Sequence, residues 1–89
     1  MIDCAYVEAI LEWAEGGPDP RVEDWLAGQD LEVLPMRAGL LLTGSRARFE
    51  HAFGADLGQA VPPVRLAIPD HLREAVASVT IPEPRKIHE

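Results

Sequence analysis

The spacing of hydrophobic residues changes several times along the chain, and each change predicts a different element. In residues 4–13, CAYVEAILEW, the odd positions from Val7 to Trp13 are apolar. They alternate with the even positions, which include Glu8 and Glu12. This period of two indicates a strand, although the same residue types also suit a helix. We prefer the strand, because the two helices predicted further along need a sheet to cover.

The first helix is predicted to follow the Gly- and Pro-rich loop that ends near residue 18. Asp19 is the expected N-cap, Pro20 takes the first helical position, and Gly28 lies where the helix is expected to end. Three apolar residues at i, i+3 and i+4 form its buried stripe: Val22, Trp25 and Leu26.

A β-hairpin is predicted next, over residues 31–43. Leu31 and Val33 alternate with a glutamate until Pro35, which is typical of an edge strand or a bulge. The return strand, residues 40–43, is apolar on both faces, so we expect it in the interior of the sheet.

A second helix is predicted from the capping residue Ser45 to Gly54, the expected left-handed stop. Its apolar face consists of Phe49, Ala52 and Phe53. We expect two short extended pieces, separated by Pro62 and Pro63, to follow this helix.

A third helix is expected from Pro69, because four apolar residues follow at i, i+3, i+4 and i+7: Leu72, Ala75, Val76 and Val79. The final segment, TIPEPRKIHE, has no apolar period and predicts an extended, mobile tail. The sequence thus predicts an α+β domain over residues 1–79 and a tail over 80–89. Its fold is expected to be the ferredoxin-like β-α-β-β-α-β antiparallel sheet with helices on one face and an added C-terminal helix.

Composition narrows the possible classes of partner. The 89 residues carry a net charge of −7, and the eight Lys and Arg residues are scattered along the chain. Such a surface repels nucleic-acid phosphates, so we expect no nucleic-acid binding. No segment approaches the length of a membrane span, and the N-terminus lacks a signal-peptide pattern. The default expectation is therefore a cytoplasmic protein that does not bind membranes.

No group of side chains in the sequence predicts catalysis, and we expect neither a metal ion nor a cofactor. The single cysteine, Cys4, lies in an apolar segment without basic neighbours and is interpreted as a packing residue rather than a nucleophile. Ser45 is interpreted as a cap. The three histidines lack metal-ligand spacing and are expected on the surface: His51, His71 and His88.

The remaining candidates also have simpler structural interpretations. The carboxylates of Glu8, Glu12 and Glu15 are expected to form an exposed acidic face rather than an acid–base pair. Trp13 and Trp25 are expected to pack in the core rather than to bind a ligand. We therefore expect a protein that is not an enzyme.

Five short motifs nevertheless occur in a specific order between residues 22 and 79: Trp25-Leu26, Leu31–Val33, Thr43-Gly44, Ala52-Phe53-Gly54 with Leu57, and Ile68-Pro69 with Leu72. In this order and spacing they resemble the pro-domain of the sedolisin (serine-carboxyl) proteases. The chain departs from that family at Asp30, where a glycine is usual, and in its short first connection. The Ser-Gly-Thr-Ser motif of the protease and its acidic partners are absent.

The resemblance implies a protein that binds and inhibits a subtilisin-fold serine protease, or assists its folding. Its sheet face would pack on the enzyme, and its tail would enter the active-site cleft as an extended strand. The tail residues that this role implies are Ile81, Pro82, Pro84, Arg85, Lys86, Ile87, His88 and Glu89. The alternative is a small acidic protein-interaction or regulatory module in a biosynthetic pathway, with no protease partner.

Overall fold

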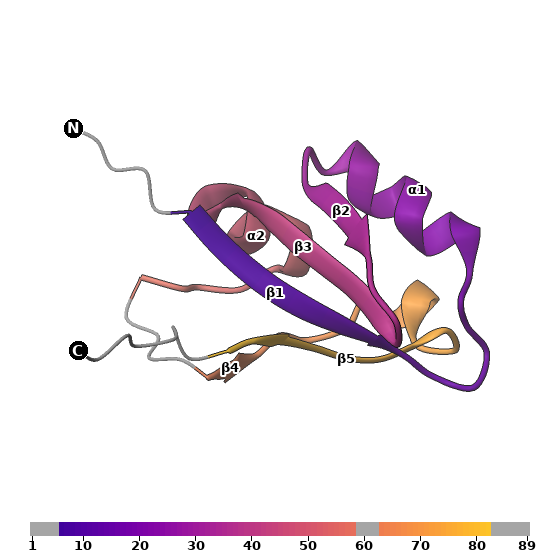
Figure 1. Ribbon diagram of the computed structural model, residues 1–89. Helices are drawn as coiled ribbons and strands as arrows, with labels where there is room; N and C mark the ends of the chain where they lie inside the picture. Colours follow the sequence, from indigo (N-terminus) through magenta and orange to yellow (C-terminus); the bar gives the residue numbers. More distant parts are fainter. Residues whose placement is uncertain (1–5, 59–62, 83–89) are drawn as a thin grey trace, which may run out of the picture.

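The chain forms an α+β fold in a computed structural model that describes residues 6–58 and 63–82 (Figure 1). The elements in chain order are β1 (Tyr6–Trp13), α1 (Pro20–Gly28), β2 (Glu32–Pro35), β3 (Gly39–Ser45), α2 (Arg46–Phe53), β4 (Val64–Arg65), a 3-10 helix η1 (Asp70–Leu72) and β5 (Val76–Ile81). The strands form one antiparallel sheet in the order β2-β3-β1-β5-β4.

Strand β1 lies in the middle of this sheet, which settles the choice between strand and helix for its residues. Ile10 pairs with Leu41 of β3 on one side and with Thr80 of β5 on the other. Burial alternates along the strand, since Ala9 and Leu11 are fully buried whereas Glu8 and Glu12 are exposed. The preferred strand is therefore confirmed over residues 6–13, and Cys4 lies outside the described residues.

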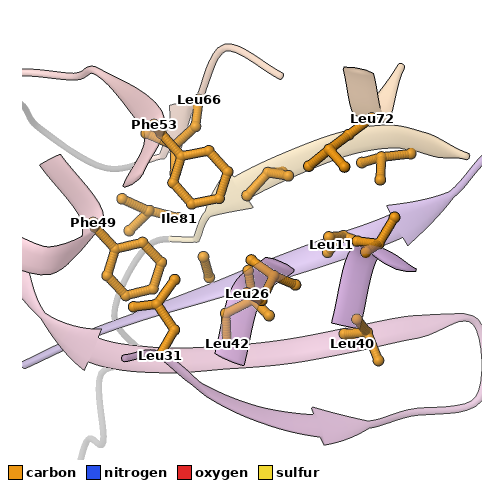
Figure 2. Close-up of a cluster of buried hydrophobic side chains, with 14 of the residues drawn as sticks. Leu11, Leu26, Leu31, Leu40, Leu42, Phe49, Phe53, Leu66, Leu72 and Ile81 are labelled. Carbon is orange, nitrogen blue, oxygen red and sulfur yellow. The ribbon is translucent and has the colours of Figure 1, made fainter. Parts of the chain in front are cut away.

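The hydrophobic core lies between the two helices and one face of the sheet (Figures 1 and 2). Helix α1 contributes Val22 and Leu26, and α2 contributes Phe49 and Phe53. These side chains pack against inward-facing residues of the three central strands, among them Leu11, Leu42 and Val79. Both helices thus cover the same face of the sheet, as the sequence predicted.

Both helices begin at the predicted capping residues. The Asp19 carboxylate accepts a hydrogen bond from the backbone N–H of Arg21 at 2.9 Å, and Pro20 occupies the first turn. The Ser45 hydroxyl accepts from the N–H of Arg48 at 3.2 Å. Each cap satisfies a backbone donor that the first turn of a helix leaves without a partner.

The helices end in the same left-handed conformation but with different residues. Gly54 ends α2 at φ 63°, which confirms its predicted role. Gly28 is the last helical residue of α1, as expected, and Asp30, two residues further on, takes the left-handed conformation at φ 63°. The N–H groups of Asp30 and Leu31 donate to the carbonyls of Ala27 and Leu26, so hydrogen bonds close the end of α1 within three residues of Gly28.

The predicted third helix is wrong. Only the short η1 forms after Pro69, residues 73–75 form a turn, and the last residues assigned to that helix belong to strand β5. Between β1 and β5 the register shifts, so that Val79 pairs with Leu11 but Val76 with Trp13. The bulge lets Val76 and Val79 both face the core at a spacing of three. A spacing of three is also the mark of a helix, which explains the error.

Strand β5 also moves the predicted domain boundary. Its last residue, Ile81, pairs with Val64 of β4 and is 9% exposed. The folded unit therefore extends at least to Ile81, beyond the boundary predicted at residue 79. Of the two extended pieces predicted before Pro69, Val64–Arg65 forms the edge strand β4, and residues 59–62 lie outside the described part of the chain.

Candidate functional site

The residues predicted to form a partner-binding tail are only partly described by the structure. Ile81 is a core residue of β5 rather than part of a free tail, which corrects its predicted role. Pro82 is exposed and directly follows the strand. The other predicted tail residues, Pro84, Arg85, Lys86, Ile87, His88 and Glu89, lie outside the described residues.

The face of the sheet opposite the helices carries a row of apolar side chains. Ile10 of β1 is the cross-strand neighbour of Leu41 of β3, which in turn is the neighbour of Leu34 of β2. Directly paired residues of antiparallel strands point to the same side of the sheet, so these three side chains adjoin. Leu34 is 59% exposed, and the other two are half-buried. We call Leu34, Leu41 and Ile10 the apolar row.

The same row continues toward the other edge of the sheet with polar side chains. Thr80 of β5 pairs with Ile10, and Arg65 of β4 pairs with Thr80. The open face therefore changes from apolar at β2, β3 and β1 to polar and basic at β4. A partner that covers the apolar row would lie over the half of the sheet formed by β2, β3 and β1.

Three carboxylates border the apolar row. Glu8 and Glu12 lie two residues before and after Ile10 on β1, and Glu32 lies two residues before Leu34 on β2. All three are exposed. The Thr43 hydroxyl donates to Glu32 at 3.2 Å, and the Ser78 hydroxyl donates to Glu12 at 3.3 Å. These cross-strand hydrogen bonds hold two of the carboxylates against the sheet beside the apolar row.

Further exposed apolar side chains extend this surface at its ends. Tyr6, 68% exposed, precedes Glu8 by two residues on β1 and therefore lies on the same side of the sheet. Met36, 40% exposed, lies in the hairpin turn directly after β2. A surface on which exposed apolar residues gather is typical of protein–protein contact.

The edge of β2 offers little for pairing with another strand. The Met36 N–H donates to the Gly39 carbonyl at 2.8 Å, which fixes the alternation of hydrogen-bonded pairs along the hairpin. By that alternation the backbone groups of Val33 and Pro35 point away from β3. Proline has no N–H group, so of these two residues only Val33 can donate a backbone hydrogen bond to an added strand. Contact through the face is therefore better supported than extension of the sheet.

A shallow cleft of about 510 Å³ lies between α1 and η1, and it contains one of the predicted core tryptophans. Trp25 packs edge-on against Phe53 at 5.8 Å between ring centroids and against His71 at 5.6 Å. Trp25 and Trp13 are both partly buried against the core, in agreement with their interpretation as packing residues. His71 and His51 are exposed, as expected, whereas His88 lies outside the described residues.

Charged side chains in this cleft serve the first turn of α1. Asp19 accepts hydrogen bonds from both the guanidinium and the backbone N–H of Arg21, and these bonds lower the pKa of its carboxyl.

Within residues 6–58 and 63–82, no three His, Cys, Asp or Glu side chains are close enough to hold a metal ion. The open face of the sheet is therefore the best-defined candidate site in the described chain.

Sequence reasoning anticipated a binding role for the sheet face but did not single out the apolar row. A signal was present in the return strand, whose three leucines in succession were expected to be apolar on both faces. Leu40 and Leu42 fill the core, so Leu41 necessarily faces the open side. The alignment of Leu41 with Ile10 and Leu34 depends on strand order and register.

Comparisons with protein-family models, with curated proteins and with solved structures found no match to this chain. Among the described residues, no helix is long and apolar enough to cross a membrane.

Proposed function

We propose that this protein binds a subtilisin-fold serine protease through the open face of its sheet and inhibits it. The observation that carries the proposal is the apolar row, which crosses three strands on the face that neither helix covers. The choice of partner follows from the ordered motifs that resemble the sedolisin pro-domain.

The open face is suited to binding because it is already ordered. Burial of apolar surface contributes roughly 25 cal/mol per Å², and association must overcome the cost of ordering side chains and loops. Ile10 and Leu41 lie on two neighbouring interior strands, β1 and β3, whose pairing covers seven residues of each. Little backbone ordering would accompany their burial under a partner.

The motifs that carry the resemblance lie mostly in the scaffold. Phe53 and Leu57 are buried in the core, and Gly54 ends α2 in a left-handed conformation. Asp30, which departs from the usual glycine of the family, also has positive φ. A glycine is favoured at such a position, so this difference is compatible with the same backbone. The motifs thus support a shared scaffold, and the partner is inferred by analogy.

We also infer that the fold is a variant of the ferredoxin-like arrangement. The neighbouring order β2-β3-β1-β5 supports this inference, with α1 between β1 and β2, and α2 between β3 and β5. In this interpretation β5 is the fourth strand, and the two-residue β4 is an addition at the edge of the sheet.

The second part of the proposed mechanism is the segment after β5. Residues 83–89 would enter the active-site cleft of the protease as an extended strand, and Pro82, which restricts the backbone, would lead into it. Ile81 would anchor the start of this segment, since it is held in β5 by its pairing with Val64.

Steady-state inhibition of several subtilisin-fold proteases, sedolisins included, tests the proposal. The parent is compared with Leu41→Asp, which places a charge in the apolar row, and with a matched control, Ala47→Asp, at an exposed position of α2. We expect Leu41→Asp to lose inhibition and the control to retain it. Absence of inhibition by the parent at high micromolar concentration would contradict the protease proposal.

A deletion of residues 83–89 tests the role of the tail separately. The sheet ends at Ile81, so the truncated chain should keep its fold. We expect weaker inhibition but continued binding to the enzyme, because the open face is intact. Equal inhibition by the truncated and full-length chains would remove the tail from the mechanism and leave the face as the inhibitory surface.

The alternative is an interaction module whose partner is not a protease. One observation favours it: Ile81, which was predicted to belong to the cleft-filling tail, is instead a buried residue of β5. In that case the parent would inhibit none of the enzymes, and Leu41→Asp would still abolish its binding to the true partner.

A further inference from the structure

The open face combines an apolar row with carboxylates of one sign, and this combination constrains the chemistry of its partner. Building on the proposed role of that face, we propose that the partner presents lysine or arginine side chains around an apolar centre. The apolar centre would cover Ile10 and Leu41, and the cations would meet Glu8, Glu12 and Glu32.

The positions of the carboxylates support this arrangement. Glu8 and Glu12 are four residues apart on β1, or about 13 Å at the rise of a strand. Thr43 pairs with both Glu8 and Glu32, so these two glutamates lie two strand spacings apart, about 10 Å. Both separations exceed the Debye length of about 8 Å at physiological salt, so each carboxylate acts mainly on the partner cation placed nearest to it.

A second copy of this chain fits the face less well. Packing two open faces together would bring two sets of three carboxylates into one interface, where like charges oppose association. Among the residues of the five strands, Arg65 is the one cation, and it lies at the β4 edge away from the apolar row. The net charge of −7 adds to the repulsion between copies.

Two designed helical peptides serve as probes that require no knowledge of the natural partner. Both carry the same leucine stripe, flanked by lysines in one peptide and by glutamates in the other. Binding is followed by NMR of methyl groups, with Ile10, Leu34 and Leu41 reporting on the open face and Leu26 and Leu42 on the core. We expect the lysine peptide to shift the three open-face methyl signals first and the glutamate peptide to shift none.

Two triple variants with the same change in net charge separate local from overall electrostatics. Glu8→Gln/Glu12→Gln/Glu32→Gln removes the charges beside the row, whereas the control, Glu15→Gln/Glu23→Gln/Glu74→Gln, removes charges in loops and on α1. We expect about a tenfold loss of affinity for the lysine peptide in the first and less than about twofold in the control. The difference should vanish near 1 M salt, where the Debye length is about 3 Å.

Glu8→Gln alone provides a second variant in case the triple change weakens the fold, since it breaks neither of the hydrogen bonds that hold Glu12 and Glu32. A smaller loss of affinity in the same direction supports the proposal. Equal losses of affinity in the two triple variants would overturn the proposal and indicate that the overall charge of the protein determines binding. Equal affinity for the lysine and glutamate peptides would also overturn the proposal and indicate that apolar contact alone determines binding.

Self-association and protease inhibition are measured separately. A concentration-dependent dimer in analytical ultracentrifugation that Leu41→Asp abolishes would identify a second copy as the occupant and overturn the basic partner. If no protease is inhibited but the peptides and triple variants behave as expected, the protease proposal fails and the charge inference stands. Inhibition that is unaffected by the first triple variant would contradict the charge inference and leave the protease proposal intact.

Discussion

The two faces of the sheet are built from the same strands but have different surroundings. On the covered face, Leu42 of β3 is fully buried beneath the helices. On the open face, its neighbour Leu41 is half-buried and has only the flat surface of the sheet around it. Successive side chains of a strand point to opposite sides, so these adjacent leucines have different surroundings.

If the open face binds a partner as proposed, one short strand serves both stability and recognition. On the covered side, apolar side chains fill space between helices and sheet, so a truncation there leaves a cavity. On the open side, a truncation only reduces the area that a partner can cover. Changes on the covered face should therefore alter the free energy of unfolding, and changes on the open face should alter binding.

The largest effect is expected for Phe53→Ala on the covered face. Phe53 is 6% exposed and packs against Trp25 and Phe49, at 5.8 and 6.1 Å between ring centroids. The cavity should lower the free energy of unfolding by about 3–5 kcal/mol, a large part of the stability of a small domain. Urea denaturation followed by circular dichroism measures the change. A midpoint equal to that of the parent would mean that α2 does not pack as described.

A comparison of Leu42→Ala with Leu41→Ala tests the two faces at adjacent positions of one strand. Leu42→Ala should lower the free energy of unfolding by about 2–5 kcal/mol, because it opens a cavity in the core. Leu41→Ala should lower it by about 1 kcal/mol or less, because that side chain has no covering layer. The same denaturation experiment applies to both. Equal losses at the two positions would contradict the distinction between a covered and an open face.

The ends of the two covering helices allow a smaller, matched test. Gly54→Ala should destabilise by about 1 kcal/mol, because alanine is strained at a φ of 63°. Asp30→Gly should stabilise by up to about 1 kcal/mol, because it relieves the same strain at the end of α1. In guanidinium titration, the two substitutions should change the free energy of unfolding with opposite signs. Changes of the same sign would contradict the left-handed conformation at one of the two helix ends.

The smallest effect is expected for Asp19→Asn at the start of α1, since asparagine still caps the helix. Hydrogen bonds from Arg21 lower the pKa of Asp19 in the folded protein, so the ionised carboxylate stabilises the fold above the pKa of the unfolded chain. That contribution is lost as the pH falls below about 4. The advantage of the parent over the variant in stability should therefore be smaller at pH 2.5 than at pH 6. A constant difference across this range would show that the charge of Asp19 contributes nothing.

The sequence alone indicated the elements whose signals are local. Capping by Asp19 and Ser45, the left-handed stop at Gly54 and the alternation of β1 each depend on a few neighbouring residues, and the structure agrees with all of them. The same local reasoning failed from residue 73 to 81, because a bulge gave strand β5 the three-residue spacing of a helix. It placed the end of α1 correctly at Gly28, but it did not single out Asp30, which takes the left-handed conformation two residues later.

The open face depended on the tertiary structure. The residue types of Ile10, Leu34 and Leu41 can be read from the sequence, and so can the excess of negative charge. Their alignment in one row requires the order β2-β3-β1 and the register of two strand pairs, which are contacts between distant parts of the chain. The sequence determined which residues are apolar or charged, because those are properties of single side chains. Strand pairing and helix packing decided which of them remain uncovered, because burial depends on the whole fold.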